Sequence, residues 1–350
     1  MKKVLACAIA LLVGVVSYAQ MNNSSVYQLG SGNDSDVTQV GYMNDSDVDQ
    51  LGDDNESDVL QVGVTNGSTV LQDGDDNDSD TQQLGDGNTS TVTQTGNDND
   101  AHAHQGFSGL STGNDGNTGT ITQTGNGNYA HVDQYTTGGD SDNNISSVLQ
   151  MGDDNFAFTD QQGDFNGSGV SQVGNDNDSW VLQIGAANGS LVIQSGDDNY
   201  SDVDQDGNNN TSGVAQSGND NESYVDQVGT LNNSSVLQSG DRNYSEVNQD
   251  GFGNFSDVKQ FGDDNESYVD QMGTNNISGV IQTGNDNYSK VYQDGFINTS
   301  TVLQTGDDHT SCVWQDGDFN SSTVTQTGNG HMSDVTQIGN SNSSVVTQSN

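Results

Sequence analysis

Residues 265–275 read Asn-Glu-Ser-Tyr-Val-Asp-Gln-Met-Gly-Thr-Asn, and this stretch contains the pattern that decides the fold. Its Asn, Ser, Val and Gln stand at alternate positions, so they lie on one face of an extended strand. The Gly that follows permits a turn. A helix would scatter the same four residues around its circumference. The stretch therefore predicts a strand followed by a turn.

The same eleven-residue pattern, N-x-S-x-V-x-Q-x-G-x-x, recurs from Asn22 to the C-terminus in 29 units. Gln fills its position in all 29 units and Asn in 27, with His309 and His331 as the exceptions. Ser, Val and Gly fill their positions in 25, 25 and 26 units. Self-similarity at a short fixed period is typical of solenoids, in which each unit packs on the next.

The turns alternate in composition, so the structural unit is a coil of 22 residues with two strands and two unlike turns. One kind of turn reads Asp-Asp or Asn-Asp, as at 53–54 and 97–98, and the other is mostly non-acidic, as at 186–187. We expect an all-β fold, a two-sheet β-solenoid of stacked 22-residue strand-turn-strand-turn coils, cross-β and amyloid-like. Identical residues should then stack in ladders along the axis, with Val inside and side-chain amides hydrogen-bonded.

Two stretches break the eleven-residue count, 106–116 by seven residues and 135–143 by five. Both fall at the non-acidic edge of consecutive coils. We expect irregular loops there that form one protrusion, and fibre assembly that tolerates their deletion.

The composition excludes several classes of function. Only 29% of the residues are hydrophobic, and 50 acidic residues face 5 Lys and Arg, for a formal charge of −45. The core of an ordinary enzyme of this length needs more apolar residues. Nucleic acid and anionic membranes are excluded as partners because both require basic residues. The absence of Pro argues for β-ladders rather than disorder.

The N-terminus has the features of a signal peptide. Lys2 and Lys3 precede an apolar run over 4–16, and small residues stand at Ser17 and Ala19, which predicts cleavage before Gln20. We expect residues 1–19 to be the signal peptide and 20–350 the repeat solenoid. The mature chain then has a single cysteine, Cys312, and no disulfide framework.

The repeat resembles a known family. Gln172-Val-Gly-Asn-Asp-Asn177-Asp-Ser179-Trp-Val-Leu-Gln183 has the spacing Q-x-G-x-x-N-x-[A/S]-x-x-x-Q of the curlin repeat, found in subunits of curli, the bacterial functional amyloid. The resemblance covers nearly all of residues 22–350. It implies a secreted subunit that polymerises into extracellular, cell-surface amyloid fibres (curli-type pili or fimbriae) for cell adhesion and biofilm matrix. The implied partners are further copies of the chain, other curlin-like subunits or a nucleator, and an outer-membrane secretion apparatus.

This chain differs from the family in three ways. It has more repeats, it has Ser where curlins have Ala, and it lacks a secretion-targeting stretch between signal peptide and repeats. The resemblance leaves open whether the chain is a major subunit, a minor subunit or a nucleator.

The two outer faces differ in charge. Strands after an acidic turn carry 19 charged residues in 42 outward positions, and the other strands carry 5 in 45. The quieter face has an apolar column near its Gln edge, which we interpret as a surface for lateral fibre pairing or matrix contacts, although repeat duplication alone would also produce it. The column consists of Leu71, Leu149, Ile193, Leu237, Ile281 and Leu303.

The sequence assigns no catalytic, cofactor-binding or metal-binding residues, and we expect a protein that is not an enzyme. His102, His104 and His131 project from the charged face near Asp100 and Asp133, where Zn²⁺ or Cu²⁺ is conceivable, but single surface histidines are commoner than sites.

The acidic turns hold an Asp column at 154, 176, 198 and 220. Because the G-G-x-G-x-D pattern of Ca²⁺-binding β-rolls is absent, we expect no cofactor and at most diffuse Ca²⁺ binding. Like charges along this column repel one another and should oppose assembly at neutral pH. Low pH and added cations neutralise these charges and should make assembly easier. The alternative function is a soluble monomeric acidic β-solenoid that binds Ca²⁺, ice or another surface.

Overall fold

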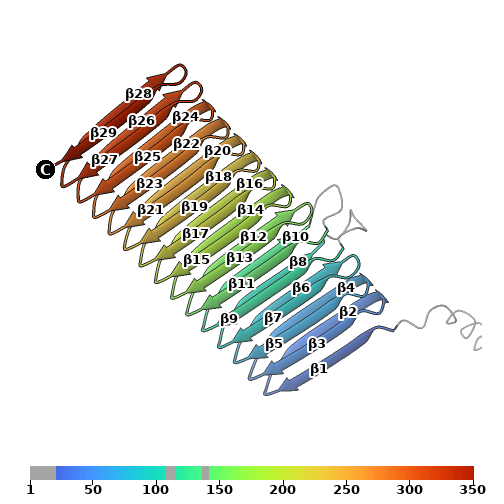
Figure 1. Cartoon of the computed structure of the whole chain (residues 1–350). Coiled ribbons are helices and arrows are strands. Elements are labelled where there is room, and N and C mark those ends of the chain that lie inside the picture. Colours follow the sequence, from blue (N-terminus) through green and yellow to red (C-terminus); the bar gives the residue numbers. More distant parts are fainter. Residues whose placement is uncertain (1–20, 107–114, 136–141) are drawn as a thin grey trace, which may run out of the picture.

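The chain forms a two-layered rod of 29 β-strands (Figure 1). The computed structural model describes residues 21–106, 115–135 and 142–350. Consecutive strands alternate between two sheets, so that all odd-numbered strands form a 15-stranded sheet and all even-numbered strands form a 14-stranded sheet. We call these the odd sheet and the even sheet. The two-sheet β-solenoid expected from the sequence is confirmed.

The strands of the odd sheet are β1 (Asn23–Leu29), β3 (Asp45–Leu51), β5 (Gly67–Asp73), β7 (Thr89–Thr95), β9 (Thr118–Thr124), β11 (Ile145–Met151), β13 (Gly167–Val173), β15 (Gly189–Ser195), β17 (Thr211–Ser217), β19 (Asn233–Ser239), β21 (Phe255–Phe261), β23 (Ile277–Thr283), β25 (Thr299–Thr305), β27 (Ser321–Thr327) and β29 (Ser343–Ser349). The strands of the even sheet are β2 (Asp34–Tyr42), β4 (Glu56–Val64), β6 (Asp78–Leu84), β8 (Asp100–Gln105), β10 (Tyr129–Gln134), β12 (Phe156–Gln162), β14 (Asp178–Ala186), β16 (Tyr200–Asn208), β18 (Glu222–Thr230), β20 (Tyr244–Phe252), β22 (Glu266–Thr274), β24 (Tyr288–Phe296), β26 (Thr310–Asp316) and β28 (Met332–Ile338).

Neighbouring strands are parallel and in register, so each residue lies beside its counterpart one coil away. Val203 of β16 pairs with Val225 of β18, 22 residues further on. The interval is 29 residues from β7 to β9 and 27 residues from β9 to β11, as the Gln ladder shows. Of the two irregular stretches expected from the sequence, residues 107–114 and 136–141 lie outside the described part of the chain.

The space between the sheets is filled by the repeating Asn, Ser, Val and Gln side chains. The Val residues form one continuous apolar cluster, from Val48 to Val335, with Ala or Ile at a few positions. The Gln of every repeat unit from Gln50 to Gln326 is buried as well. Because buried amides are costly unless they are hydrogen-bonded, this core depends on its ladders.

Two Gln ladders run the length of the rod without a break. In each link, Nε2 of one Gln donates to Oε1 of the Gln in the next coil, over 2.7–3.1 Å. The odd sheet contains the ladder from Gln28 to Gln348, and the even sheet contains the ladder from Gln39 to Gln337. Each amide therefore adds an axial bond to those of the backbone.

The repeating Gly is required by a close backbone approach between coils. Gly240 has φ +122°, and a Cβ placed on it would lie 2.1 Å from the carbonyl oxygen of Gly262. The residue two positions after each such Gly adopts a left-handed conformation, such as Asp176 at φ 54° and Ile297 at φ 54°. Asp and Asn tolerate this conformation better than β-branched residues, which accounts for their frequency in the turns.

Candidate assembly surfaces and the histidine cluster

The two ends of the rod expose strand edges. Among the described residues, β1 pairs only with β3 and β29 pairs only with β27. In the even sheet, β2 pairs with β4 and β28 with β26, and neither has a second neighbour in the described part of the chain. An unpaired parallel edge presents N–H and C=O groups to any strand of matching register.

The outer face of the even sheet combines acidic and aromatic side chains, and we call it the even face. Tyrosines from five consecutive coils form a zigzag stripe on it, with ring centroids 5.3–5.7 Å apart. The sequence analysis did not predict this stripe, because the tyrosines of adjacent coils stand at different outward positions of the repeat. The stripe consists of Tyr200, Tyr224, Tyr244, Tyr268 and Tyr288.

Several carboxyl groups on the even face are difficult to ionise. Burial raises the pKa of Asp204 to about 6, and the nearby charges of Asp226 and Asp202 act in the same direction. Burial also raises the pKa of Asp178 to about 6 and that of Asp160 to about 6. These three carboxyl groups therefore take up protons well above the pH at which an ordinary Asp does so.

The turns from odd to even strands form the acidic edge of the rod. The first Asp or Asn of each turn accepts a hydrogen bond from the backbone N–H of the preceding coil, as Oδ1 of Asp75 does from Asp53 over 2.8 Å. These residues thus form a structural ladder besides carrying charge. In the next column, Arg242 makes a bidentate contact with Asp264, at 2.8 and 2.7 Å, and interrupts the run of Asp residues.

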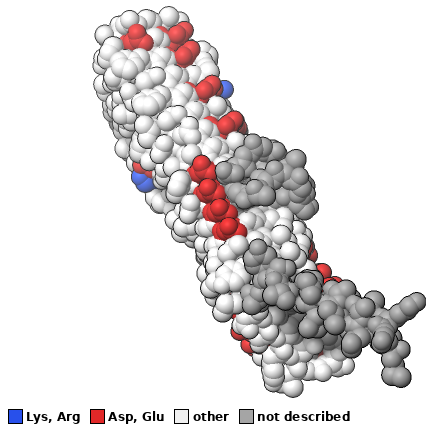
Figure 2. Space-filling view, turned by 90° about the vertical axis from the view of Figure 1, so that its right-hand side faces the viewer, with Lys and Arg blue, Asp and Glu red and all other residues white. Residues whose placement is uncertain are grey.

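The opposite edge, whose turns the sequence indicates to be mostly non-acidic, also contains a row of acidic residues. Backbone N–H groups of successive coils donate to Asp carboxylates there, and the row runs through four coils with distances of 2.7–3.2 Å. Its members are Asp86, Asp115, Asp142 and Asp164. Figure 2 shows acidic side chains in a row along the rod, with few basic side chains beside them.

The outer face of the odd sheet contains the apolar column, and we call it the odd face. Leu237 pairs in register with Ala215, and Ile281 pairs with Leu303, all pointing outward. Ile193 is exposed. Lateral pairing on this face stays a prediction.

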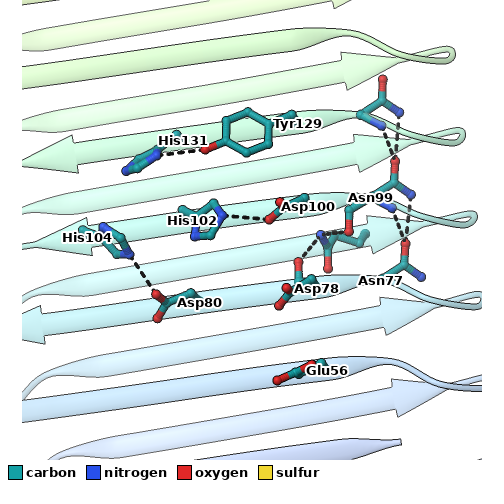
Figure 3. A network of polar contacts seen from close by, with 12 residues as sticks. Glu56, Asn77, Asp78, Asp80, Asn99, Asp100, His102, His104, Tyr129 and His131 are labelled. Atoms are coloured by element: carbon teal, nitrogen blue, oxygen red, sulfur yellow. Dashed lines mark hydrogen bonds and ion pairs between the residues drawn. The ribbon is translucent and has the colours of Figure 1, made fainter. Parts of the chain in front are cut away.

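The three outward histidines lie together on the even face (Figure 3). His102 and His104 belong to β8, and His131 belongs to β10, its hydrogen-bonded neighbour. Their ring centroids are 5.0–5.8 Å apart. Each ring contacts a carboxylate: His102 contacts Asp100 at 2.9 Å, and His131 contacts Asp133 at 2.9 Å.

His104 contacts two carboxylates from the coils on either side. Its Nε2 lies 3.1 Å from Asp80 and its Nδ1 lies 3.2 Å from Asp133. Burial opposes a charge on His104, but the hydrogen bonds to Asp133 and Asp80 outweigh burial and raise the pKa to about 9. Burial likewise opposes the charge of Asp133, and the bonds from His104 and His131 lower its pKa to about 2. The sequence analysis did not connect Asp80 with the histidines, because Asp80 lies 24 residues before His104 in the chain.

His309 and His331 occupy inward Asn positions and preserve the Asn hydrogen bonds. Nδ1 of His309 accepts the backbone N–H of His331 at 3.2 Å, as an Asn Oδ1 does elsewhere. The two rings stack with centroids 5.4 Å apart and an interplanar angle of 2°. They are structural substitutes for Asn.

Sites for chemistry are sparse on this rod. Among the described residues, two sets of three metal-ligating groups occur, both within the histidine cluster and with His104 in common. Cys312 is a free thiol on β26, and burial, together with Asp334, raises its pKa. No helix in the described residues is long and apolar enough to cross a membrane.

Comparison with known proteins identifies the family. A search of curated proteins found no match. The curlin associated repeat matches ten segments, which together cover well over half of the chain: 52–80, 74–106, 115–148, 152–185, 196–229, 232–262, 240–273, 262–295, 284–313 and 312–339. With its solenoid of 22-residue coils and these ten matches, the chain belongs to the curlin repeat family and is a curlin-like structural protein.

Proposed function

We propose that the protein is a secreted subunit that stacks end to end into extracellular cross-β fibres, curli-type pili, for cell adhesion and biofilm matrix. The observation that carries the proposal is the pair of unpaired strand edges at each end of the rod, β1 with β2 and β28 with β29. Membership in the curlin repeat family supports the same conclusion.

End-to-end stacking follows from the physics of the ladders. A second copy docked on β29 would continue the backbone bonds and extend the Gln ladder that reaches Gln348. The contact joins unlike ends, so it does not close on itself and produces an open filament. The core then grows by one subunit length at each addition, with no new type of contact.

The remaining parts of the proposal concern export and partners. The predicted signal peptide, residues 1–19, lies outside the described part of the chain and directs the protein out of the cell. Further copies, other curlin-like subunits or a nucleator are the fibre partners, and an outer-membrane secretion apparatus provides the route to the cell surface. The formal charge of −45 keeps the chain apart from nucleic acid.

The test is electron microscopy and X-ray fibre diffraction of the purified mature chain. We expect unbranched fibres with reflections near about 4.8 Å and about 10 Å. Val346→Lys places an inward charge on the edge strand β29 and should block elongation. Thr347→Lys adds the same charge on the outer face of that strand and should leave elongation intact.

A chain that stays monomeric for days at high concentration, across pH and salt, would overturn the proposal in favour of a monomeric surface-binding solenoid. Equal elongation by the two lysine variants would show that fibres form by a contact other than end-to-end stacking.

A further inference from the structure

The chain's outward imidazoles are gathered at one place. Of its five histidines, two face inward, and the other three lie on the neighbouring strands β8 and β10. The same two strands have small inward residues, Ala101, Ala103 and Ala130, all fully buried. The cluster is therefore a local departure from the repeat that changes both the surface and the core beneath it.

Two imidazole nitrogens converge on one carboxylate oxygen in this cluster. Oδ1 of Asp133 lies 2.9 Å from Nε2 of His131 and 3.2 Å from Nδ1 of His104. Ligand atoms around a tetrahedral Zn²⁺ with bonds of about 2.0–2.1 Å are about 3.3 Å apart. We propose that His104, His131 and Asp133 bind a divalent transition-metal ion of the Zn²⁺ type, with a water molecule as fourth ligand.

The second ring nitrogens are held in the way that such a site requires. Nε2 of His104 lies 3.1 Å from Oδ2 of Asp80, and Nδ1 of His131 lies 3.2 Å from the hydroxyl of Tyr129. With the metal on Nδ1 of His104 and Nε2 of His131, the N–H groups at the other ring nitrogens donate to these oxygens. Metal-binding histidines usually have such a partner, which fixes the tautomer and the ring orientation.

The donor set selects the kind of metal. Two imidazoles and one carboxylate suit Zn²⁺, Cu²⁺ or Ni²⁺, whereas Ca²⁺ and Mg²⁺ require oxygen ligands. The acidic surface elsewhere on the rod presents oxygens alone, so it attracts any divalent cation without this preference. The metal would join β8 to β10, the two strands of neighbouring coils between which the sequence interval widens from 22 to 29 residues.

A second set of groups, Asp80, His102 and His104, shares one histidine with the proposed site. His102 is already in contact with Asp100 at 2.9 Å, and the side chain of Asp80 is 31% exposed against 16% for Asp133. The more buried set is therefore the better site, and Asp80 supports it from outside.

The test is equilibrium dialysis of the metal-free full chain against Zn²⁺ in a large excess of Ca²⁺ and Mg²⁺, which occupy the diffuse acidic sites. We expect one Zn²⁺ per chain. His131→Asn and Asp133→Asn should each weaken binding more than about tenfold, and Asp80→Asn by about tenfold. The matched control is Asp204→Asn on β16, at the same position of the repeat, which should retain full affinity. Circular dichroism checks that each variant keeps its β-structure.

Three results would overturn the proposal. The first is that no Zn²⁺ is retained above the competing cations. The second is that Asp204→Asn weakens binding as much as Asp133→Asn, which would mean diffuse binding. The third is that His102→Gln abolishes binding while His131→Asn preserves it, which would assign the metal to the other set. The visible absorption of bound Co²⁺ supplies an independent readout of tetrahedral ligands.

Discussion

Nε2 of Gln194 donates a hydrogen bond of 2.9 Å to Oε1 of Gln216, one coil further along the axis. The same amide also donates to the backbone carbonyls of Asp178 and Asn199, at 2.9 and 3.0 Å. Gln194 is fully buried. One side chain thus joins its own coil, the turn that follows and the next coil.

Gln194→Glu should destabilise the rod strongly. The carboxylate has no N–H to donate and places an acceptor or a charge in the buried ladder, at a cost of more than about 2 kcal/mol. Guanidinium unfolding followed by circular dichroism measures the loss. Ser195→Glu, at an exposed outward position of the same strand β15, is the control and should change the midpoint little. Equal effects at the two positions would deny the ladder its structural role.

Gly240→Ala should prevent neighbouring coils from approaching. The new methyl group would meet the carbonyl oxygen of Gly262 at 2.1 Å, and the backbone is in a region that L-residues avoid. We expect a loss of about 3 kcal/mol or more in unfolding experiments. Gly213→Ala has nothing within 4 Å of the new Cβ and serves as the matched control. A destabilisation by Gly213→Ala of the same size would contradict this explanation.

Ser245→Ala should stabilise the protein. Ser245 is fully buried, and its hydroxyl has no hydrogen-bond partner among the described residues. Its removal relieves a desolvation penalty of about 1 kcal/mol, and Ala retains the packing. Differential scanning calorimetry should show a higher melting temperature for this variant than for the outward control Ser235→Ala. A lower melting temperature would indicate that the buried hydroxyl is satisfied in solution.

The stability of the rod should fall as the pH rises from about 4 to 7. Burial raises the pKa of Asp204 to about 6, above the value near 3.8 of an unburied Asp, so the folded state binds more protons than the unfolded chain. The stabilisation is complete below about pH 4 and is lost as the pH rises through about 6. Unfolding midpoints at several pH values measure this slope. Asp204→Asn should flatten it and stabilise the protein at pH 7.

Asp264→Asn should slightly lower the stability of the protein at pH 7, whereas Asp204→Asn should raise it. Arg242 lowers the pKa of Asp264, and this exposed pair contributes at most a small stabilisation at neutral pH. If Asp204→Asn leaves the change of stability with pH unaltered, the carboxyl groups of the even face do not cause the pH dependence of stability.

Much of the fold could be predicted because the inward pattern is local. Four alternating residues and a Gly in each unit specify a strand and a turn, and the alternation of turn composition specifies the 22-residue coil. The ladders follow, since identical residues meet in any parallel in-register stack. The even and odd faces could be distinguished from the sequence for the same reason.

The features that the sequence analysis did not predict depend on contacts between coils that the repeat pattern does not specify. Asp115 and Asp142 join the acid row of the opposite edge only after intervals of 29 and 27 residues. Tyr224 lies beside Tyr200 because adjacent coils place their aromatics at different outward positions, and a zigzag has no single period. Both the acid row and the tyrosine stripe arise from contacts between side chains of neighbouring coils. The order of residues along the chain does not specify these contacts.

The parallel strands and the one-way Gln ladders give the rod a direction, like an arrow with a head and a tail. From Gln28 to Gln348, every amide in the odd sheet offers its N–H toward the C-terminal end and its oxygen toward the other. A copy that arrived upside down would set donor against donor or acceptor against acceptor. A filament built from this rod therefore has two chemically distinct tips, and the rates at which they gain subunits need not be equal.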